Sequence, residues 1–301
     1  MLTVGQARSE PIKIDVGQNV YALTFTANGK YLVTGCWDVQ VLQVKDGKQV
    51  ARMETHCDVL SVAASKNGKW IAAGTSEGMV VWNAQTYEQV LKYNKGGRLW
   101  GEDIRCVDFS PDSTRLIAGS EKKIAIVWDL GTGKHIQTLH HGDMVTAAKY
   151  SPQGDRIATA THSGPVGVWD SNDGRLLVNI GVNVTPWSNT GLLWSYGHLF
   201  IASDKTIKEF DASTGSKVSE WPIPYTNNYS CIALPKYEEF IAFSAKRTIT
   251  LWDISTHSQL PLTVQHSENI RSIAFSHDDR VLAIGGGRKI TLLPVSTVSL
   301  G

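Results

Sequence analysis

Few groups of residues in this 301-residue sequence have the types and spacing that chemistry requires. The segment 74–78, GTSEG, has the form G-x-S-x-G, in which a sharp turn from a strand into a helix exposes a nucleophilic serine. The surrounding pattern instead predicts a turn between two strands, without the helix that defines such an elbow. We therefore interpret this segment as a turn and expect no catalytic residue in it.

Two other motifs partly match ligand sites. The segment 131–134, GTGK, resembles a phosphate-binding loop, but it lacks the first glycine and is followed by His135 where Ser or Thr would bind magnesium. His140 and His141 could suggest a metal site, yet adjacent residues of a strand point to opposite faces and no third ligand follows at a useful spacing. We expect a hairpin turn and a structural histidine, with no metal and no cofactor.

The cysteines do not form a site either. Their positions include no C-x-x-C spacing, which argues against both a zinc ribbon and a disulfide framework. We expect reduced cysteines in the core or in turns at Cys36, Cys57, Cys106 and Cys231.

Composition narrows the class of partner. The chain has 29 basic and 28 acidic side chains, a formal charge of +1, and lacks the excess of positive charge typical of nucleic-acid binding. No stretch approaches the roughly 18 apolar residues of a membrane helix, and the first residues lack the hydrophobic run of a signal peptide. We expect a soluble, cytoplasmic protein that binds neither nucleic acid nor membrane.

A repeat organises the whole chain. One equivalent position is occupied by Leu42, Trp82, Trp128, Trp169, Phe210, Trp252 and Leu293, at intervals of 40, 46, 41, 41, 42 and 41 residues. A period of about 40 to 45 residues with a recurrent Trp-Asp dipeptide is typical of propeller blades made of four antiparallel strands. Seven periods predict an all-β, seven-bladed β-propeller.

Each period has the pattern of short strands. In the unit 104–128, the apolar runs IRCVDF, RLIAGS and IAIVW are separated by two turns, and Asn28-Gly29 and Asp173-Gly174 are typical turn pairs elsewhere. No segment has a sustained period of 3.6 residues, so we expect essentially no helix. The many small residues of the first runs suit innermost strands at a crowded centre.

The two ends of the sequence predict how the ring closes. The seventh period ends after three strands, while residues 11–16, PIKIDV, alternate apolar and charged residues ahead of the first period. We expect this N-terminal strand to pair with the last blade and to remove an exposed strand edge. We expect a single domain over residues 1–301, with blades at about 18–54, 56–93, 102–140, 141–181, 188–223, 226–264 and 266–296, the last completed by 11–16.

These features resemble the WD-repeat family, to which the β subunit of heterotrimeric G proteins belongs. The dipeptide is intact at Trp128-Asp129, Trp169-Asp170 and Trp252-Asp253 and is altered to Trp82-Asn83 and Phe210-Asp211. Trp37-Asp38 is a false match, because the alignment places it in the turn before the strand that ends at Leu42. The arrays at the sensing end of NACHT-type signalling ATPases are also similar, although no nucleotide-binding segment is present here.

The resemblance implies a hydrogen-bonded set within a blade, made by a His before the innermost strand, a Ser or Thr, a turn Asp and the Trp. Here His141 and His266 occupy the His position, His56 is one residue out of phase, and the turn Asp is mostly missing. We therefore expect most blades to rely on apolar packing, and the fifth blade to be the most degenerate.

The candidate partner-binding residues lie on one predicted face of the ring. In this topology, the loops that lead into the innermost strands and the turns between second and third strands surround the same mouth of the channel. Trp, Tyr and Arg are enriched at interface hot spots. The candidates are Tyr21, Trp37, Trp100, Arg105, Lys122, Trp187, Trp194, Tyr225, Arg247, Arg271 and Arg288.

The favoured hypothesis is a non-enzymatic scaffold, monomeric by itself, that binds a protein or peptide of unknown identity on this face. The alternative is a lectin-like propeller that binds a carbohydrate or another small ligand with its aromatic side chains. A propeller enzyme would need clustered His, Asp or Glu around the channel, and the sequence predicts no such cluster.

Overall fold

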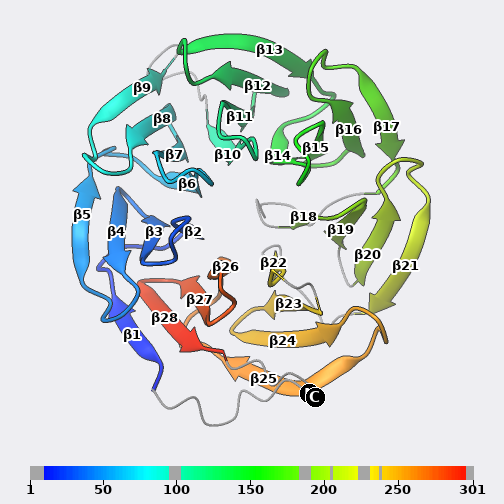
Figure 1. Ribbon diagram of the computed structural model, residues 1–301. Helices are drawn as coiled ribbons and strands as arrows, with labels where there is room; N and C mark the ends of the chain where they lie inside the picture. The colour runs from blue at the N-terminus through cyan, green and yellow to red at the C-terminus, as the bar shows by residue number, and fades with distance from the viewer. Residues whose placement is uncertain are drawn as a thin grey trace.

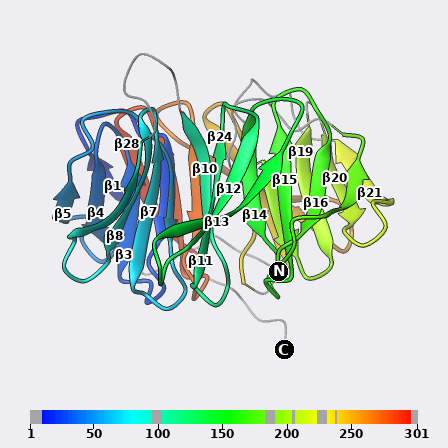
Figure 2. The same ribbon diagram turned by 90° about the horizontal axis from the view of Figure 1, so that it is seen from above.

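The computed structural model of the protein describes residues 10–94, 103–182, 191–203, 206–222, 231–236 and 239–295. Within these residues, the strands form seven four-stranded antiparallel sheets, and there is no helix. The sheets stand as blades around an open axis, with the innermost strands next to the axis and the outer strands along the rim (Figures 1 and 2). The predicted seven-bladed propeller is confirmed.

The blades follow one another along the chain, each written here from the innermost strand outward. The first blade is β2 (Ala22–Phe25), β3 (Tyr31–Gly35), β4 (Val39–Gln43) and β5 (Gln49–Met53). The second is β6 (Val59–Ala64), β7 (Trp70–Thr75), β8 (Gly78–Asn83) and β9 (Gln89–Tyr93). The third is β10 (Ile104–Phe109), β11 (Arg115–Ser120), β12 (Ile124–Asp129) and β13 (Lys134–His140). The fourth is β14 (Val145–Tyr150), β15 (Arg156–Thr161), β16 (Val166–Asp170) and β17 (Leu176–Ile180).

The remaining blades complete the ring. The fifth is β18 (Leu192–Ser195), β19 (His198–Ser203), β20 (Thr206–Asp211) and β21 (Lys217–Pro222). The sixth is β22 (Ile232–Ala233), β23 (Phe240–Ala245), β24 (Thr248–Asp253) and β25 (Gln259–Gln265). The seventh is β26 (Ser272–Phe275), β27 (Val281–Gly286), β28 (Lys289–Pro294) and β1 (Ile12–Asp15).

Burial follows the radial order of the strands. Most residues of the second and third strands are buried, as in β7 and β11. Both faces of these strands are covered, because each blade packs between its two neighbours. The outer strands alternate, and in β5 and β17 exposed residues outnumber buried ones. Small residues in the second strands, such as Ala72 and Ala118, let neighbouring blades approach closely. All four cysteines are buried and form no disulfide.

The Asp of the Trp-Asp dipeptide shapes the turn into the outer strand. Asp129 Oδ1 accepts hydrogen bonds from the backbone N–H of Thr132 at 2.7 Å and from the Thr132 hydroxyl at 2.8 Å. Gly133 then takes a φ of 67°, a left-handed conformation that glycine adopts without strain. The segment 131–134 is therefore a hairpin turn, as the sequence analysis predicts.

The N-terminal strand closes the ring as predicted. β1 pairs antiparallel with β28, from Ile12 opposite Leu292 to Asp15 opposite Lys289. Lys289 Nζ lies 2.5 Å from Asp15 Oδ2, and Ile12 and Ile14 pack against the apolar cluster between the seventh and first blades. At Gly47, in the turn between β4 and β5, a Cβ atom would come within 2.7 Å of the Ile14 side chain. The closing strand is thus held by both blades that it joins.

The hydrogen-bonded set implied by the family resemblance is present in the fourth blade, without its Asp. The Thr159 hydroxyl lies 2.9 Å from His141 Nε2 and accepts a hydrogen bond from Trp169 Nε1 at 2.7 Å. Burial lowers the pKa of His141 to about 4. In the third blade Ala118 occupies the Thr159 position by register, and Trp128 Nε1 is buried without a hydrogen-bond partner. Apolar packing therefore stabilises the third blade in place of the hydrogen-bonded set.

Removal of residues 1–17 should lower the melting temperature by roughly 5 °C or more, because the variant leaves β28 unpaired and exposes the apolar cluster beneath Ile12 and Ile14. A variant that begins at Glu10 keeps β1 and should melt as the intact protein does. Thermal unfolding followed by circular dichroism tests both. Equal melting of the intact and shortened proteins would show that β1 does not hold the ring.

His141 should make stability depend on pH. Its folded pKa of about 4 lies below the unfolded value of about 6.5, so its contribution is complete above pH 6.5 and decreases as the pH falls from 6.5 to 4. The expected decrease is on the order of 3 kcal/mol. Urea unfolding at several pH values should show this slope in the wild type and a reduced slope in a His141→Asn variant. An unchanged slope in the variant would contradict the assignment.

Candidate functional site

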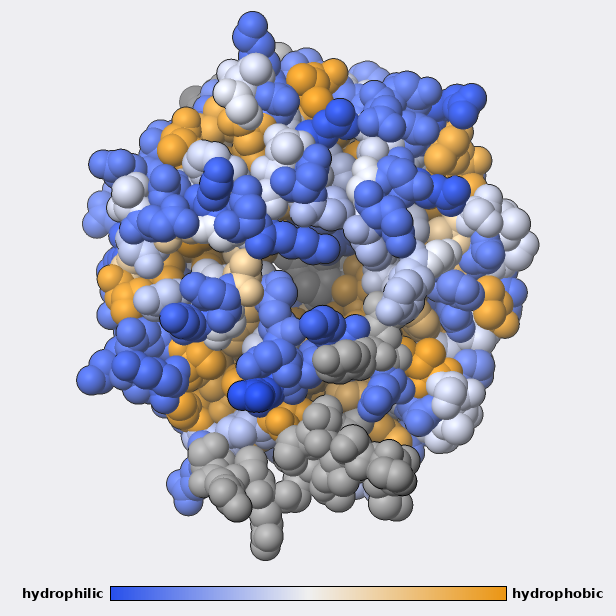
Figure 3. Space-filling model, in the orientation of Figure 1, coloured by the Kyte–Doolittle hydropathy of each residue, from blue (hydrophilic) through white to orange (hydrophobic). Residues whose placement is uncertain are grey.

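The ring has two faces that differ in the connections they carry. The loop face carries the loops into the innermost strands and the turns between second and third strands, and the turn face carries the other two sets of turns. A hollow lies at the centre of the ring, with hydrophilic residues around it (Figure 3). Among the candidates, Trp100, Trp187 and Tyr225 fall outside the residues that the structure describes.

Seven of the candidates lie at the loop-face ends of their strands. Tyr21, Arg105 and Arg271 occupy equivalent places near the start of the innermost strands, as their positions relative to the registers show. Trp37, Lys122, Arg247 and Arg288 lie in turns between the second and third strands. The structure therefore brings these residues to one face around the channel.

Trp194 does not join them. It pairs with Leu199, next to the turn that links β18 to β19, so it lies toward the turn face. Its indole N–H donates to the backbone carbonyl of Lys149 at 3.1 Å, across the junction with the fourth blade. The reason for the difference is strand length, because β18 has only four residues and its third residue is already near the far end. The predicted placement of Trp194 on the loop face is thus corrected.

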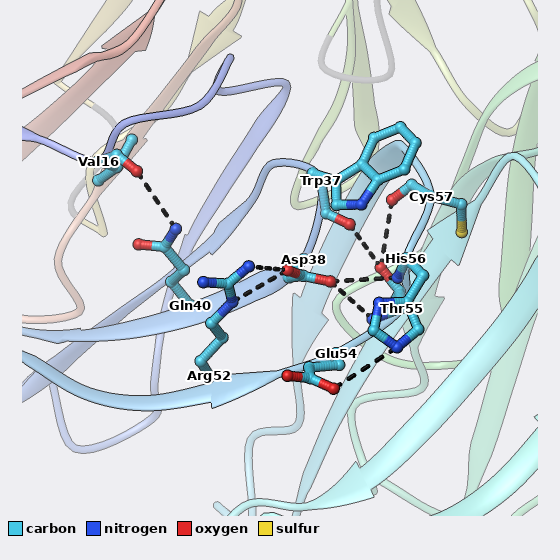
Figure 4. A network of polar contacts seen from close by, with 9 residues as sticks. All are labelled: Val16, Trp37, Asp38, Gln40, Arg52, Glu54, Thr55, His56 and Cys57. Atoms are coloured by element: carbon cyan, nitrogen blue, oxygen red, sulfur yellow. Dashed lines mark hydrogen bonds and ion pairs between the residues drawn. The ribbon is translucent and has the colours of Figure 1, made fainter.

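Asp38 organises the turn that presents Trp37 (Figure 4). Its side chain is 1% exposed, and Oδ1 accepts hydrogen bonds from the backbone N–H groups of Thr55 at 2.9 Å and His56 at 3.1 Å. Oδ2 accepts a hydrogen bond from Arg52 Nε at 3.0 Å. Burial alone would raise the pKa of Asp38, but these hydrogen bonds outweigh it and lower the pKa.

Trp37 lies in the turn that the hydrogen bonds of Asp38 hold in place. The Thr55 hydroxyl donates to the Trp37 carbonyl at 2.9 Å, while 42% of the Trp37 residue is exposed. A large aromatic side chain on an immobilised turn can bury much area on binding at little cost in conformational entropy. The sequence analysis singled out Trp37 but not the carboxylate beneath it.

A second group of contacts joins three blades at the channel mouth. Arg271 Cζ lies 4.9 Å from the centre of the Tyr21 ring, a cation–π contact between the seventh and first blades. Burial and then the nearby Asp58 carboxylate, from the second blade, raise the pKa of Tyr21. The phenol is therefore neutral and held between a cation and an anion.

Arg105 lies between two carboxylates. Its Nε donates to Glu121 Oε1 at 2.8 Å, and its terminal nitrogen lies 3.0 Å from Asp103 Oδ2. Burial and the Glu121 carboxylate raise the pKa of Asp103, while Arg105 opposes this rise. These acidic partners, together with Asp58, were missed from the sequence. The available signal for Asp58 and Asp103 was their shared position just before an innermost strand, which Asn19 occupies in the first blade.

Charge is distributed unevenly over the loop face. The first three blades bring Asp38, Asp58, Glu77, Asp103 and Glu121 to it, while the sixth and seventh bring Lys246, Arg247, Arg271 and Arg288. The Arg288 side chain is 63% exposed, and its Nε lies 3.8 Å from Asp15 Oδ1. Lys122 is exposed on the third blade and moderates the acidic side. Arg105 and Lys123 also lie on the side of the first three blades, and Glu268 lies on the side of the seventh. Acidic residues are thus more numerous than basic ones on the first side, and basic residues are more numerous on the second.

A pocket opens at the edge of the loop face on the fourth blade. It has a volume of about 330 Å³ and is lined by His140, Trp169, Leu176 and Gly167, among others. The position of Gly167 in the third strand is taken by Val80 in the second blade and by Ile126 in the third. A Cβ atom at Gly167 would come within 2.8 Å of Trp169 Nε1, so the indole can lie over this position in the pocket wall only because the residue is glycine.

A smaller cavity with polar side chains lies in the central channel. A cavity of about 230 Å³ lies among the innermost strands, where Lys149 Nζ approaches Asp108 Oδ1 at 3.4 Å. Asp108 also accepts the backbone N–H of Tyr150 at 2.9 Å, which ties the third blade to the fourth. Within the described ranges, no three His, Cys, Asp or Glu residues are grouped as metal ligands. Nor does that part of the chain contain a helix of the length and hydropathy that a membrane span requires.

Replacement of Asp38 by Asn should destabilise the protein by about 2 kcal/mol, because an amide N–H₂ would face the Arg52 guanidinium. The lowered pKa of Asp38 means that its contribution is present above the unfolded pKa of about 3.9 and is lost as the pH falls through the folded value. Urea unfolding at neutral and acidic pH measures both effects. Asp46→Asn, at a turn carboxylate of the same blade, is the control and should cost under about 0.5 kcal/mol; equal stabilities of the two variants would contradict the role of Asp38.

The comparisons with known proteins agree with this architecture. The family model for the WD domain, G-beta repeat, matches residues 10–38, 47–83, 96–129, 133–170 and 259–292. The unmatched stretch from 171 to 258 contains the fifth blade, which the sequence analysis expects to be the most degenerate.

Relatives are similar at low identity. Human WD repeat-containing protein 18 is 24% identical over 300 residues, which are 90% of this chain and 65% of that protein. Periodic tryptophan protein 2 of Arabidopsis thaliana is 24% identical over 237 residues, 73% of this chain and 25% of that protein. The serine-threonine kinase receptor-associated protein of Dictyostelium discoideum is 24% identical over 133 residues, 44% of this chain and 43% of that protein.

The chain therefore spans less than two thirds of the length of these relatives. The matched repeats nevertheless cover more than half of the chain, and the seven blades supply the geometry that such repeats form. This chain belongs to the WD-domain, G-beta repeat family.

Proposed function

We propose that this protein is a non-catalytic scaffold that binds a protein or peptide segment on its loop face. Proteins built from WD repeats generally act as interaction scaffolds, which supports the general class. The observation that carries the proposal is the exposed Trp37 on a turn fixed by the buried Asp38. Such a side chain is suited to serve as an anchor at the centre of an interface.

The charges on the loop face favour one orientation of the partner. The side of the face around Asp103, where acidic residues are more numerous, would attract the basic end of a partner segment. The side around Arg271, where basic residues are more numerous, would attract its acidic end, so the segment would lie across the mouth of the channel. A net charge of +1 supports a protein partner in preference to a nucleic acid. One relative is named for its association with a serine-threonine kinase receptor, which is consistent with a partner-binding role.

The described turns do not favour the lectin-like alternative. A propeller lectin would repeat an aromatic side chain at the same place in several blades. The turn that holds Trp37 in the first blade instead holds Lys122 in the third and Arg247 in the sixth. We retain the protein-binding hypothesis.

Substitution of Trp37 by Ala should remove most of the partner that the wild-type protein captures, since a buried anchor of this kind typically contributes a hundredfold in affinity, or about 2 to 3 kcal/mol. Affinity capture from a native lysate with quantitative mass spectrometry is the measurement. Thermal unfolding of the variant should be close to that of the wild type, because Trp37 is 42% exposed and lies in a turn rather than in the core.

The control is Tyr196→Asn, which removes an aromatic residue that is 70% exposed in a turn of the other face. Asn tolerates the φ of 47° at that position, so the turn is retained. Loss of a captured protein in the Trp37 variant with retention in the Tyr196 variant supports the proposal. Equal retention in both would remove Trp37 from the interface.

A further inference from the structure

A separate recess lies on the turn face, at the junction of the first and second blades. It has a volume of about 640 Å³, and its walls include the aromatic side chains of Tyr31, Trp70 and Tyr87. Tyr31 and Trp70 begin the second strands of their blades, and Tyr87 lies in the turn between β8 and β9. Each of the three residues is only partly buried. The loop-face interface proposed above does not involve any of them.

The recess exists because one position of the repeat has lost its large side chain. In six of the blades, all but the sixth, the last inward position of the innermost strand pairs with the second residue of the next strand. That position holds Phe25, Phe109, Tyr150, Trp194 and Phe275 in the first, third, fourth, fifth and seventh blades. In the second blade it holds Ala64, which lines the recess.

The junction of the sixth and seventh blades shows what is missing. There, Phe275 packs edge to face on Phe240, with ring centres 5.6 Å apart and planes at 82°. Phe240 begins its second strand, as Tyr31 does in the first blade. At the junction of the first and second blades the corresponding pair is Tyr31 and Ala64. The Tyr31 ring therefore lacks the aromatic partner that its counterpart has.

Two side-chain amides at the edge of the recess are oriented by the turns that contain them. Asn28 Oδ1 accepts hydrogen bonds from the Thr26 hydroxyl at 2.8 Å and from the backbone N–H of Lys30 at 3.0 Å. Asn67 Oδ1 accepts the same two kinds of bond, at 2.8 and 3.0 Å. With both oxygens engaged, each amide presents its N–H₂ group as a donor.

The third and seventh blades do not offer these donors. The equivalent turn residue is Asp112 in the third blade and Asp278 in the seventh, and each carboxylate accepts the same local hydrogen bonds from its own turn. A carboxylate repels a peptide carbonyl, whereas an amide N–H₂ donates to it. The junction of the first and second blades thus combines an open aromatic site with two amide donors along its edge, one from each blade.

We propose that this recess binds the phenylalanine side chain of a partner peptide, with the ring in the place that Phe275 occupies at the sixth and seventh blades. The bound ring would pack against Tyr31 over Ala64, and the carbonyls of the peptide would accept hydrogen bonds from Asn28 and Asn67. The aromatic contact and the burial of an apolar ring supply the attraction, and the amides orient the main chain.

The test uses N-acetylphenylalaninamide as the probe, titrated against the full chain and followed by ligand-observed NMR. The wild type should bind it at least tenfold more tightly than N-acetylalaninamide. An Ala64→Phe variant, which restores the side chain of the other blades, should bind the probe at least tenfold more weakly and should melt at the same or a higher temperature.

A second variant keeps the test decisive if the added ring disturbs folding. Asn28→Asp combined with Asn67→Asp retains the turn geometry of the third and seventh blades, and should weaken binding several-fold by removing both donors. Tyr196→Asn, on the same face but outside the recess, is the control and should bind as the wild type does. Equal binding by the wild type and the Ala64→Phe variant would overturn the proposal. Preference for N-acetylprolinamide over the phenylalanine probe would overturn it as well, in favour of a proline-rich segment.

Discussion

Each blade of this propeller depends on the two blades beside it, because the second and third strands bury both faces and no blade could cover them alone. The dependence is circular, so the ring is stable only if the last junction is as well packed as the others. Here the closing strand carries two half-buried isoleucines, an ion pair to Lys289 and a contact with Gly47 of the first blade. Every other feature of the molecule, including both candidate binding sites, rests on the spacing that this closure enforces.

Within that frame, departures from the repeat are of two kinds. Some are absorbed by packing, as in the third blade, where Ala118 replaces the hydroxyl residue and the buried indole of Trp128 has no hydrogen-bond partner. Others leave space or chemistry at the surface, as Gly167 does on the loop face and Ala64 does on the turn face. The distinction depends on whether neighbouring side chains reach the vacated volume. Deviations of the second kind are the places where a regular array acquires specificity.

The sequence predicts the fold much better than the site. Trp82, Trp128, Trp169 and Trp252 recur at intervals set by four short strands, and this periodicity determines blade number and strand order without further information. The closing strand could also be predicted, since residues 11–16 alternate and the seventh period lacks a fourth strand.

The contacts of the site depend on facts that one sequence does not contain. In the sequence, Asp38 looks like an ordinary turn residue. Only the structure shows that its carboxylate accepts hydrogen bonds from the backbone N–H groups of residues 55 and 56. Trp194 is placed correctly only when β18 is known to be four residues long. Ala64 reads as one of many small residues of an innermost strand, and its significance appears only when the equivalent positions of the other blades are compared in three dimensions.

The pairing of β1 with β28 also has a consequence for biosynthesis. Lys289 and Asp15 are 274 positions apart, so at translation rates of about 5 to 20 residues per second, roughly 15 to 55 s separate the emergence of the two strands from the ribosome. During that interval, β1 is an unpaired strand that other chains could recruit. Lys13 and Asp15, which alternate with its isoleucines, put a charge on every second residue and discourage that pairing. The same few residues thus protect the nascent chain before they complete the native ring.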